Sequence, residues 1–173
     1  MARDYVGWYR TKAQLERSGN LVNYRSKEIW WCSIGVNLGH EEDGKNSGFE
    51  RPVLVIKKYS KYLFLGLPMT SSLKEGKFYY SVDVNHTPRS VILSQGRTMS
   101  AFRLRRRVYK LNDNIFDEIV TRYAGLVIEV PNKTDSQKTG SPRVPNGNLC
   151  PHYTKRKRNS QDHVALKTSN ELK

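Results

Sequence analysis

The chain has 173 residues, of which only 37% are hydrophobic, so one domain is expected and part of the length should stay outside its core. Lysine and arginine number 30 against 16 acidic residues, and this net charge of +14 favours a polyanion, nucleic acid first, as partner. Two cysteines are too few for a disulfide framework, and no apolar run reaches the ~18 residues of a membrane span. With no signal-peptide pattern at the N-terminus, the expected location is the cytoplasm.

The first 23 residues are predicted to form an N-terminal helical extension (1–23). Residues 4–17 have the periodicity of a short amphipathic helix, with an apolar face made of Tyr5, Trp8 and Leu15. The sequence Ser18-Gly19-Asn20 should end this helix, because glycine and asparagine tolerate the left-handed conformation.

A β-rich stretch follows, in which aromatic and β-branched runs alternate with turn residues. The predicted strands span residues 28–36, 51–59, 62–67, 77–84, 90–94 and 106–111. A polar, glycine-containing loop separates the first two strands. Short strands at this spacing are typical of a small barrel or sandwich.

The barrel domain is predicted to span residues 24–131, and a single helix is predicted at its C-terminal end. Asn112 can cap its N-terminus, apolar residues at helical spacing follow, and Pro131 stops it. The composition then changes, because residues 132–173 are mostly polar and contain nine basic and three acidic residues. This segment is predicted to be a disordered basic tail, since it cannot bury enough surface to offset its ordering entropy.

Three motifs occur in a fixed order between these elements. Arg51-Pro52 follows the glycine-containing loop and opens an apolar strand, Pro68-Met69-Thr70-Ser71 ends the third strand, and Gln95-Gly96-Arg97 follows the fifth. In this order they resemble the MazF/PemK/Kid toxin family over residues 24–130. The resemblance implies a mainly β (α+β) fold, an SH3-like small β-barrel of the CcdB/Kid/MazF type, with a C-terminal helix and a short N-terminal helix.

The resemblance also implies a function. Members of the family are homodimeric toxins of type II toxin-antitoxin systems that cleave single-stranded RNA, often mRNA, at short sequences and so arrest growth. A cognate antitoxin protein occupies the RNA groove and inhibits them. No cofactor or metal is implied, and no His, Cys and Asp cluster in this sequence has the spacing of a metal site.

Metal-free RNA cleavage sets simple chemical requirements. The 2′-OH attacks the adjacent phosphate, so the site needs a base, a proton source for the leaving oxygen, and cations or donors for the charge on phosphorus. Arg51 is the first candidate, because a planar guanidinium grips two phosphoryl oxygens and the family's matching arginine is catalytic. Thr70 is the second, since its hydroxyl can donate to a phosphate oxygen. Without the resemblance, Arg51 would also fit a surface residue that caps a strand, and Thr70 would fit an ordinary turn.

The base is one of several loop residues. The family carries a glutamate in a Gly-x-Glu pattern before Arg-Pro, which points to Glu41 in Gly39-His40-Glu41. The loop offers other carboxylates, and a histidine can exchange a proton near neutral pH. The alternatives to Glu41 are Glu42, Asp43, Glu50 and His40.

A further set of residues is predicted to contact RNA, because cations hold phosphates and polar groups shape the groove. The set consists of Lys45, Ser71, Gln95, Arg97, Arg105 and Arg107. In a regular strand, Arg105 and Arg107 share one face while Arg106 points to the other. Trp30 and Trp31 can stack on bases, although at least one of them is expected in the core.

Two other functions fit the same fold. One is a CcdB-like toxin that binds a protein such as DNA gyrase without cutting RNA, and the other is a non-catalytic RNA-binding barrel. Neither needs a guanidinium and a hydroxyl at one phosphate. The nuclease hypothesis therefore requires the side chains of Arg51 and Thr70 to converge in one cleft.

Overall fold

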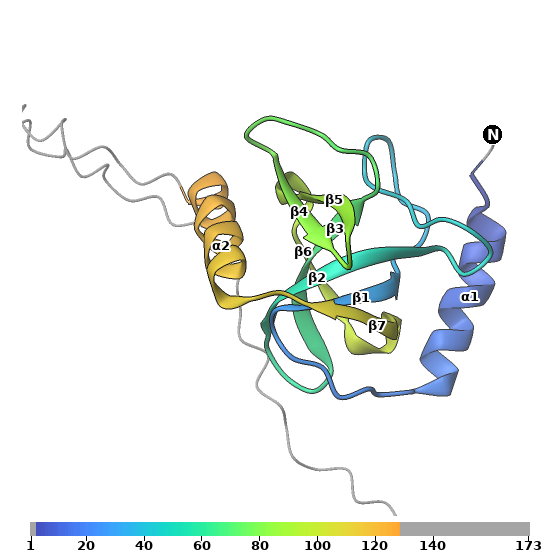
Figure 1. Cartoon of the computed structure of the whole chain (residues 1–173). Helices are drawn as coiled ribbons and strands as arrows, with labels where there is room; N and C mark the ends of the chain where they lie inside the picture. Colours follow the sequence, from blue (N-terminus) through green and yellow to red (C-terminus); the bar gives the residue numbers. More distant parts are fainter. Residues whose placement is uncertain (1–2, 129–173) are drawn as a thin grey trace, which may run out of the picture. The chain divides into compact units, whose positions relative to one another are not determined.

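The computed structural model describes residues 3–128, and its main feature is a strongly curled antiparallel sheet (Figure 1). The predicted tail (132–173) lies outside the described residues. No helix within residues 3–128 has the length and hydropathy needed to cross a membrane.

Seven strands form the sheet in the order β4-β5-β3-β2-β1-β7, with β6 paired to β3 outside this path. They are β1 (Glu28–Ser33), β2 (Glu50–Lys58), β3 (Leu63–Thr70), β4 (Tyr79–Val84), β5 (Thr87–Ile92), β6 (Arg97–Ser100) and β7 (Leu104–Lys110). The short 3-10 helices η1 (Leu93–Gln95) and η2 (Ala101–Arg103) flank β6. On one edge, β3 pairs with β2, and on the other with β6 at its start and β5 at its end, which curls the sheet into a half-barrel.

The predicted fold class, a small mainly β barrel with a helix at each end, is confirmed. The strands differ in detail. The first strand ends at Ser33 instead of residue 36, and β5 begins three residues earlier than predicted. Strand β6 was not predicted, because its four residues contain a single buried apolar side chain, Met99, and show too little alternation to be recognised as a strand.

The two helices begin and end at capping residues. In α1 (Tyr5–Ser18), the Asp4 side chain accepts a hydrogen bond from the backbone of Gly7, and Gly19 ends the helix in the left-handed conformation, as predicted. In α2 (Asp113–Val127), the predicted cap Asn112 accepts from the backbone of Ile115. This helix ends at Val127, before the predicted stop at Pro131, and Val127 is 63% exposed.

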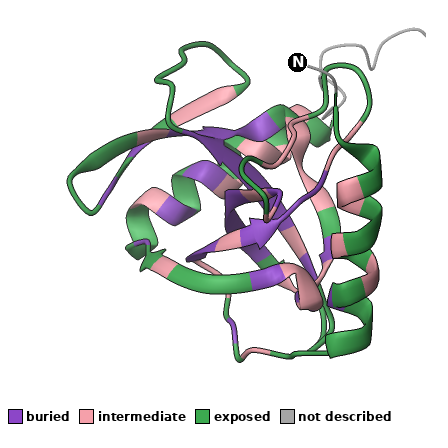
Figure 2. Cartoon of the chain, turned by 90° about the vertical axis from the view of Figure 1, so that its right-hand side faces the viewer, coloured by how far each residue is buried: buried purple, intermediate pink, exposed green. Residues whose placement is uncertain are grey.

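Buried side chains form two clusters on the two faces of the curled sheet, seen as the purple parts of its strands in Figure 2. The first cluster packs Phe116 and Ile119 of α2 against the sheet. The second contains Tyr24, Trp30 and Phe64. Trp30 is therefore a core residue, as expected for at least one of the two tryptophans, while Trp31 is half-buried.

We predict that the Cys32 thiol is unreactive in the folded protein. Cys32 is fully buried in the second cluster, and burial raises the pKa of its thiol to about 12. The thiolate is the reactive form, so a Cys150→Ser variant should react with a disulfide reagent at pH 8 about a thousandfold slower when folded than when unfolded. A comparable rate in the folded state would show that this wall of the barrel is open.

Candidate active site

Arg51 lies at the start of β2, directly after the loop from β1, and its side chain has three polar partners. Its Nε donates to the backbone oxygen of Asp43 (2.8 Å), and its Nη1 donates to that of Met69 (3.2 Å). Its Nη2 lies 2.7 Å from the carboxylate of Glu42 in an ion pair. The residue is only 8% exposed, so these contacts keep a nearly buried charge satisfied and fix its orientation.

Thr70 ends β3 on the neighbouring strand. Val53 pairs with Pro68 in the antiparallel register of β2 and β3, and Arg51 and Thr70 each stand two residues beyond this pair, near the start of β2 and at the end of β3. The Thr70 hydroxyl accepts from the backbone of Ser72 (3.3 Å), its one hydrogen bond among the described residues, so its proton remains available. The structure thus brings together the two residues that the nuclease hypothesis requires to converge.

Arg51 and Thr70 line one pocket of about 80 Å³. Two predicted RNA-binding residues, Lys45 and Ser71, also line it and are exposed. The other lining residues are Trp31, Asn46, Glu50, Pro52, Met69 and Arg89. The guanidinium has five N–H donors, of which the two backbone carbonyls engage two. With Lys45 and Arg89 beside it, the pocket offers donors and positive charge to an oxyanion.

The loop acids have separate partners, and Glu41 does not contact Arg51. Its side chain is exposed and accepts from the backbone of Leu38 (3.1 Å). It lines a different hollow of about 430 Å³ with His40, Gln95 and Arg97. The carboxylate that pairs with Arg51 is that of the next residue, Glu42, which the Gly-x-Glu pattern did not select. The Asp43 carboxylate pairs with Arg3, and Glu50, which lines the pocket of Arg51, pairs with Arg105 and Arg106 of β7.

Gln95 and Arg97 hold the loop in place. Gln95 accepts from the backbone N–H of Glu42 (2.7 Å) and donates to the backbone oxygen of His40 (3.0 Å). Arg97 donates to the Asn37 side chain (3.1 Å) and to the backbone oxygen of Ile34 (2.9 Å). These contacts give both residues a structural task, and their contact with RNA stays a prediction.

The basic strand β7 does not keep strict alternation. A register shift opposite Trp31 and Cys32 inserts Arg105 as an extra residue between Leu104 and Arg106. As a result Arg105 and Arg106 both reach Glu50, at 3.5 and 2.9 Å, while Arg107 pairs with Glu28 at 3.3 Å. The expectation that Arg105 and Arg107 share one face while Arg106 points to the other is wrong for this reason. All three arginine side chains are nevertheless largely exposed.

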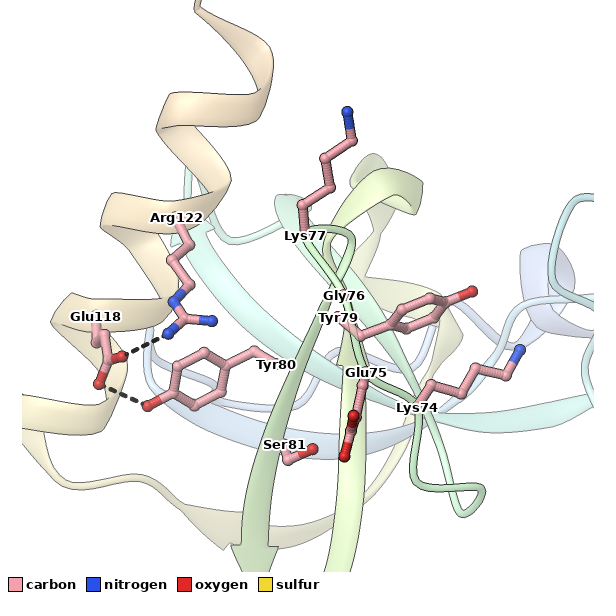
Figure 3. A pocket seen from close by; sticks show the side chains of 9 residues that line it. All are labelled: Lys74, Glu75, Gly76, Lys77, Tyr79, Tyr80, Ser81, Glu118 and Arg122. Carbon is pink, nitrogen blue, oxygen red and sulfur yellow. Dashed lines mark hydrogen bonds and ion pairs between the residues drawn. The ribbon is translucent and has the colours of Figure 1, made fainter.

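A larger hollow of about 550 Å³ lies between the residues that connect β3 to β4 and helix α2 (Figure 3). Glu118 on α2 there accepts from the Tyr80 hydroxyl (2.8 Å) and pairs with Arg122 (3.2 Å). Lys74 lies over the ring of Tyr79 and Lys77 extends away from the Glu118 cluster. Neither Arg51 nor Thr70 lines this hollow, so we place the candidate active site in the smaller pocket.

Within residues 3–128, no group of three or more His, Cys, Asp or Glu side chains is arranged to hold a metal ion. The fold and the site together define a small curled-sheet protein with a pocket, lined by Arg51, Thr70 and Lys45 among others, at the start of β2 and the end of β3.

The sequence profile of the PemK-like, MazF-like toxins of type II toxin-antitoxin systems matches residues 25–126. The chain belongs to this family, which confirms the resemblance inferred from its motifs. The match begins after α1, so this helix lies outside the shared region. No curated protein sequence matches the chain significantly.

Solved structures with a similar fold include three toxins or nucleases. MazF from Deinococcus radiodurans is 19% identical, with a TM-score of 0.49 over 62% of this chain and 97% of that one. An endoribonuclease in complex with its cognate antitoxin, from a Mycobacterial species, is 10% identical, with a TM-score of 0.48 over 61% and 95%. The Mycobacterium tuberculosis toxin MazF-mt6 is 14% identical, with a TM-score of 0.45 over 58% and 95%.

Proposed function

We propose that this toxin is an endoribonuclease that cleaves single-stranded RNA, including mRNA, at short sequences without a metal ion. The observation that carries the proposal is the convergence of the Arg51 guanidinium and the Thr70 hydroxyl in one pocket. Lys45 and Arg89 add positive charge there, and the chain as a whole carries +14. Such a pocket suits a phosphodiester within a polyanion.

The proposed reaction uses the ribose 2′ oxygen as nucleophile. The 2′ oxygen loses its proton to a base and bonds to phosphorus, the bond from phosphorus to the 5′ oxygen breaks, and that oxygen takes up a proton. The products are a 2′,3′-cyclic phosphate and a 5′-OH end. Unused N–H groups of Arg51 and the Thr70 hydroxyl donate to the phosphoryl oxygens, where negative charge builds in the transition state.

Glu42 replaces Glu41 as our candidate for the base. Its carboxylate lies 2.7 Å from Arg51 Nη2 and is partly exposed, so it stands beside the group that holds the phosphate. A base must lie within hydrogen-bond reach of the proton that it accepts. Neither glutamate lines the pocket of Arg51 and Thr70, but Glu42 contacts the guanidinium, whereas the Glu41 side chain accepts from the backbone of Leu38. Family membership also favours a homodimer and a cognate antitoxin partner, and the exposed arginines of β7 remain candidates for RNA contact.

The first prediction concerns RNA cleavage itself. Purified protein incubated with a long single-stranded RNA in EDTA should give discrete fragments with cyclic-phosphate ends. Arg51→Ala should slow cleavage by about a hundredfold or more, because it removes preorganised donors at the developing charge. Arg122→Ala, which removes an arginine from the larger hollow, is the matched control and should retain activity. Intact RNA that stays bound would support a non-catalytic RNA-binding barrel, and intact RNA without binding would support a toxin directed at a protein.

The second prediction concerns Thr70. Thr70→Ala should lower the cleavage rate about tenfold to a hundredfold, because one donor to the phosphate is lost. The fold should persist, since the hydroxyl makes one hydrogen bond among residues 3–128, to the backbone of Ser72. Thr70→Ser restores the hydroxyl and should recover most of the activity. A large fall in melting temperature in Thr70→Ala would instead assign the residue a structural role.

The third prediction separates the two glutamates. Glu42→Gln keeps the size of the side chain but removes the base, so the cleavage rate should fall about a hundredfold or more. Glu41→Gln makes the same chemical change one residue away, in a side chain that does not contact Arg51, and should have little effect. The measurement is the single-turnover rate with saturating protein. The reverse ranking of the two variants would return the role of base to Glu41.

A further inference from the structure

Helix α1 lies outside the region shared with the toxin family, yet it contacts the loop that carries Glu42. This loop, between β1 and β2, spans residues 37–49 and is called the 37–49 loop below. Arg3, just before α1, donates from Nε to the Asp43 carboxylate (2.9 Å) and from Nη2 to the backbone oxygen of Gly39 (2.6 Å). The Tyr5 hydroxyl donates to the backbone oxygen of Asn37 (3.4 Å). The start of this segment therefore holds the loop at three points.

Trp8 provides the apolar part of the same contact. Its ring packs on Phe49, at the far end of the loop, with the ring centroids 5.6 Å apart. The guanidinium of Arg103 lies 5.2 Å from the centre of the Trp8 ring on another side. Just before the loop, Gly35 has φ +92°, and a Cβ there would overlap the indole. The Trp8 indole thus packs closely against Gly35, just before the loop, and Phe49, at its end.

The contacts of α1 lead directly to the active site. One carboxylate oxygen of Asp43 accepts from Arg3 and the other from the backbone of Asn37 (2.6 Å). The backbone oxygen of the same Asp43 accepts from Arg51 Nε (2.8 Å). The Asn37 side chain also donates to the backbone oxygen of Glu42 (2.7 Å). A shift of Asp43 or Asn37 would therefore move the partners of Arg51.

The loop is held on a second side by the barrel, through Gln95 and Arg97. In Figure 1, α1 runs beside the sheet, on the side away from α2. Ordering a polar, glycine-containing loop costs conformational entropy, and side chains packed from both sides offset that cost. The ion pair of Arg3 and Asp43 is partly exposed and contributes little alone, so Trp8 should carry most of the effect.

We propose that α1 is a positioning element for the active site of this toxin. Through Arg3, Tyr5 and Trp8 it holds the 37–49 loop so that the Glu42 carboxylate and the Asp43 backbone oxygen stay on Arg51. This role rests on the proposed nuclease function. The residues of α1 are positioning residues, since none of them lines the pocket of Arg51 and Thr70.

The test compares Trp8→Ala with Tyr9→Ala in the full chain. Both variants remove an aromatic ring from α1, but Tyr9 is 75% exposed. Hydrogen exchange followed by mass spectrometry should show amides of the 37–49 loop exchanging about tenfold faster in Trp8→Ala and unchanged in Tyr9→Ala. Peptides from β3 and α2 should keep their protection in both. This measurement does not depend on RNA cleavage.

The kinetic arm should show a lower kcat in Trp8→Ala with little change in KM, because the base is displaced while the cations that hold RNA remain. Arg3→Ala should lower kcat more than Arg10→Ala, which removes the same charge from the solvent-exposed part of α1. Unchanged exchange of the loop in Trp8→Ala overturns the positioning role, and so does faster exchange throughout the barrel. If the parent chain leaves RNA intact while the loop loosens as expected, the nuclease proposal fails and the contact between α1 and the loop stands.

Discussion

The charge of Arg51 must be satisfied inside a nearly buried position, and much of the local structure follows from that constraint. Its guanidinium joins β2 to two other chain segments: to β3 through the backbone of Met69, and to the 37–49 loop through the backbone of Asp43 and the carboxylate of Glu42. A buried cation without such partners would destabilise the fold strongly. The same contacts that satisfy the charge also aim it at the pocket beside Thr70. Stability and the proposed chemistry therefore depend on one side chain.

The charges around this pocket differ from what the net charge suggests. The chain carries +14, but Glu50 pairs with Arg105 and Arg106, and Glu28 pairs with Arg107. In these pairs the arginine side chains are largely exposed, whereas the carboxylates of Glu28 and Glu50 are mostly buried. The pairs lower the positive potential along β7, so the pocket depends on cations near its own opening, Lys45 and Arg89. Local pairing decides where a polyanion is attracted.

The proposed site is organised by its surroundings as much as by its own residues. The 37–49 loop lies between α1 on one side and the segment of Gln95 and Arg97 on the other. The pairing of β2 with β3 places Arg51 and Thr70 at the same end of the two strands, where they line one pocket. Helix α2 packs Phe116 and Ile119 against one face of the sheet. Catalytic groups need such support, because small displacements of a base or a donor reduce the rate strongly.

The sequence by itself determined the elements with strong local signals: α1 with its Gly19 end, the Asn112 cap of α2, most strands, and the Arg51 and Thr70 motifs of the family. Only the tertiary structure decided which loop acid meets Arg51, because four acids near one another in the chain differ only in their contacts. The tertiary structure also decided the bulge at Arg105, the short strand β6 and the packing of Trp8 against Gly35. The physical reason is range: periodicity and capping act between near neighbours, whereas register and loop contacts join residues that are distant in the chain.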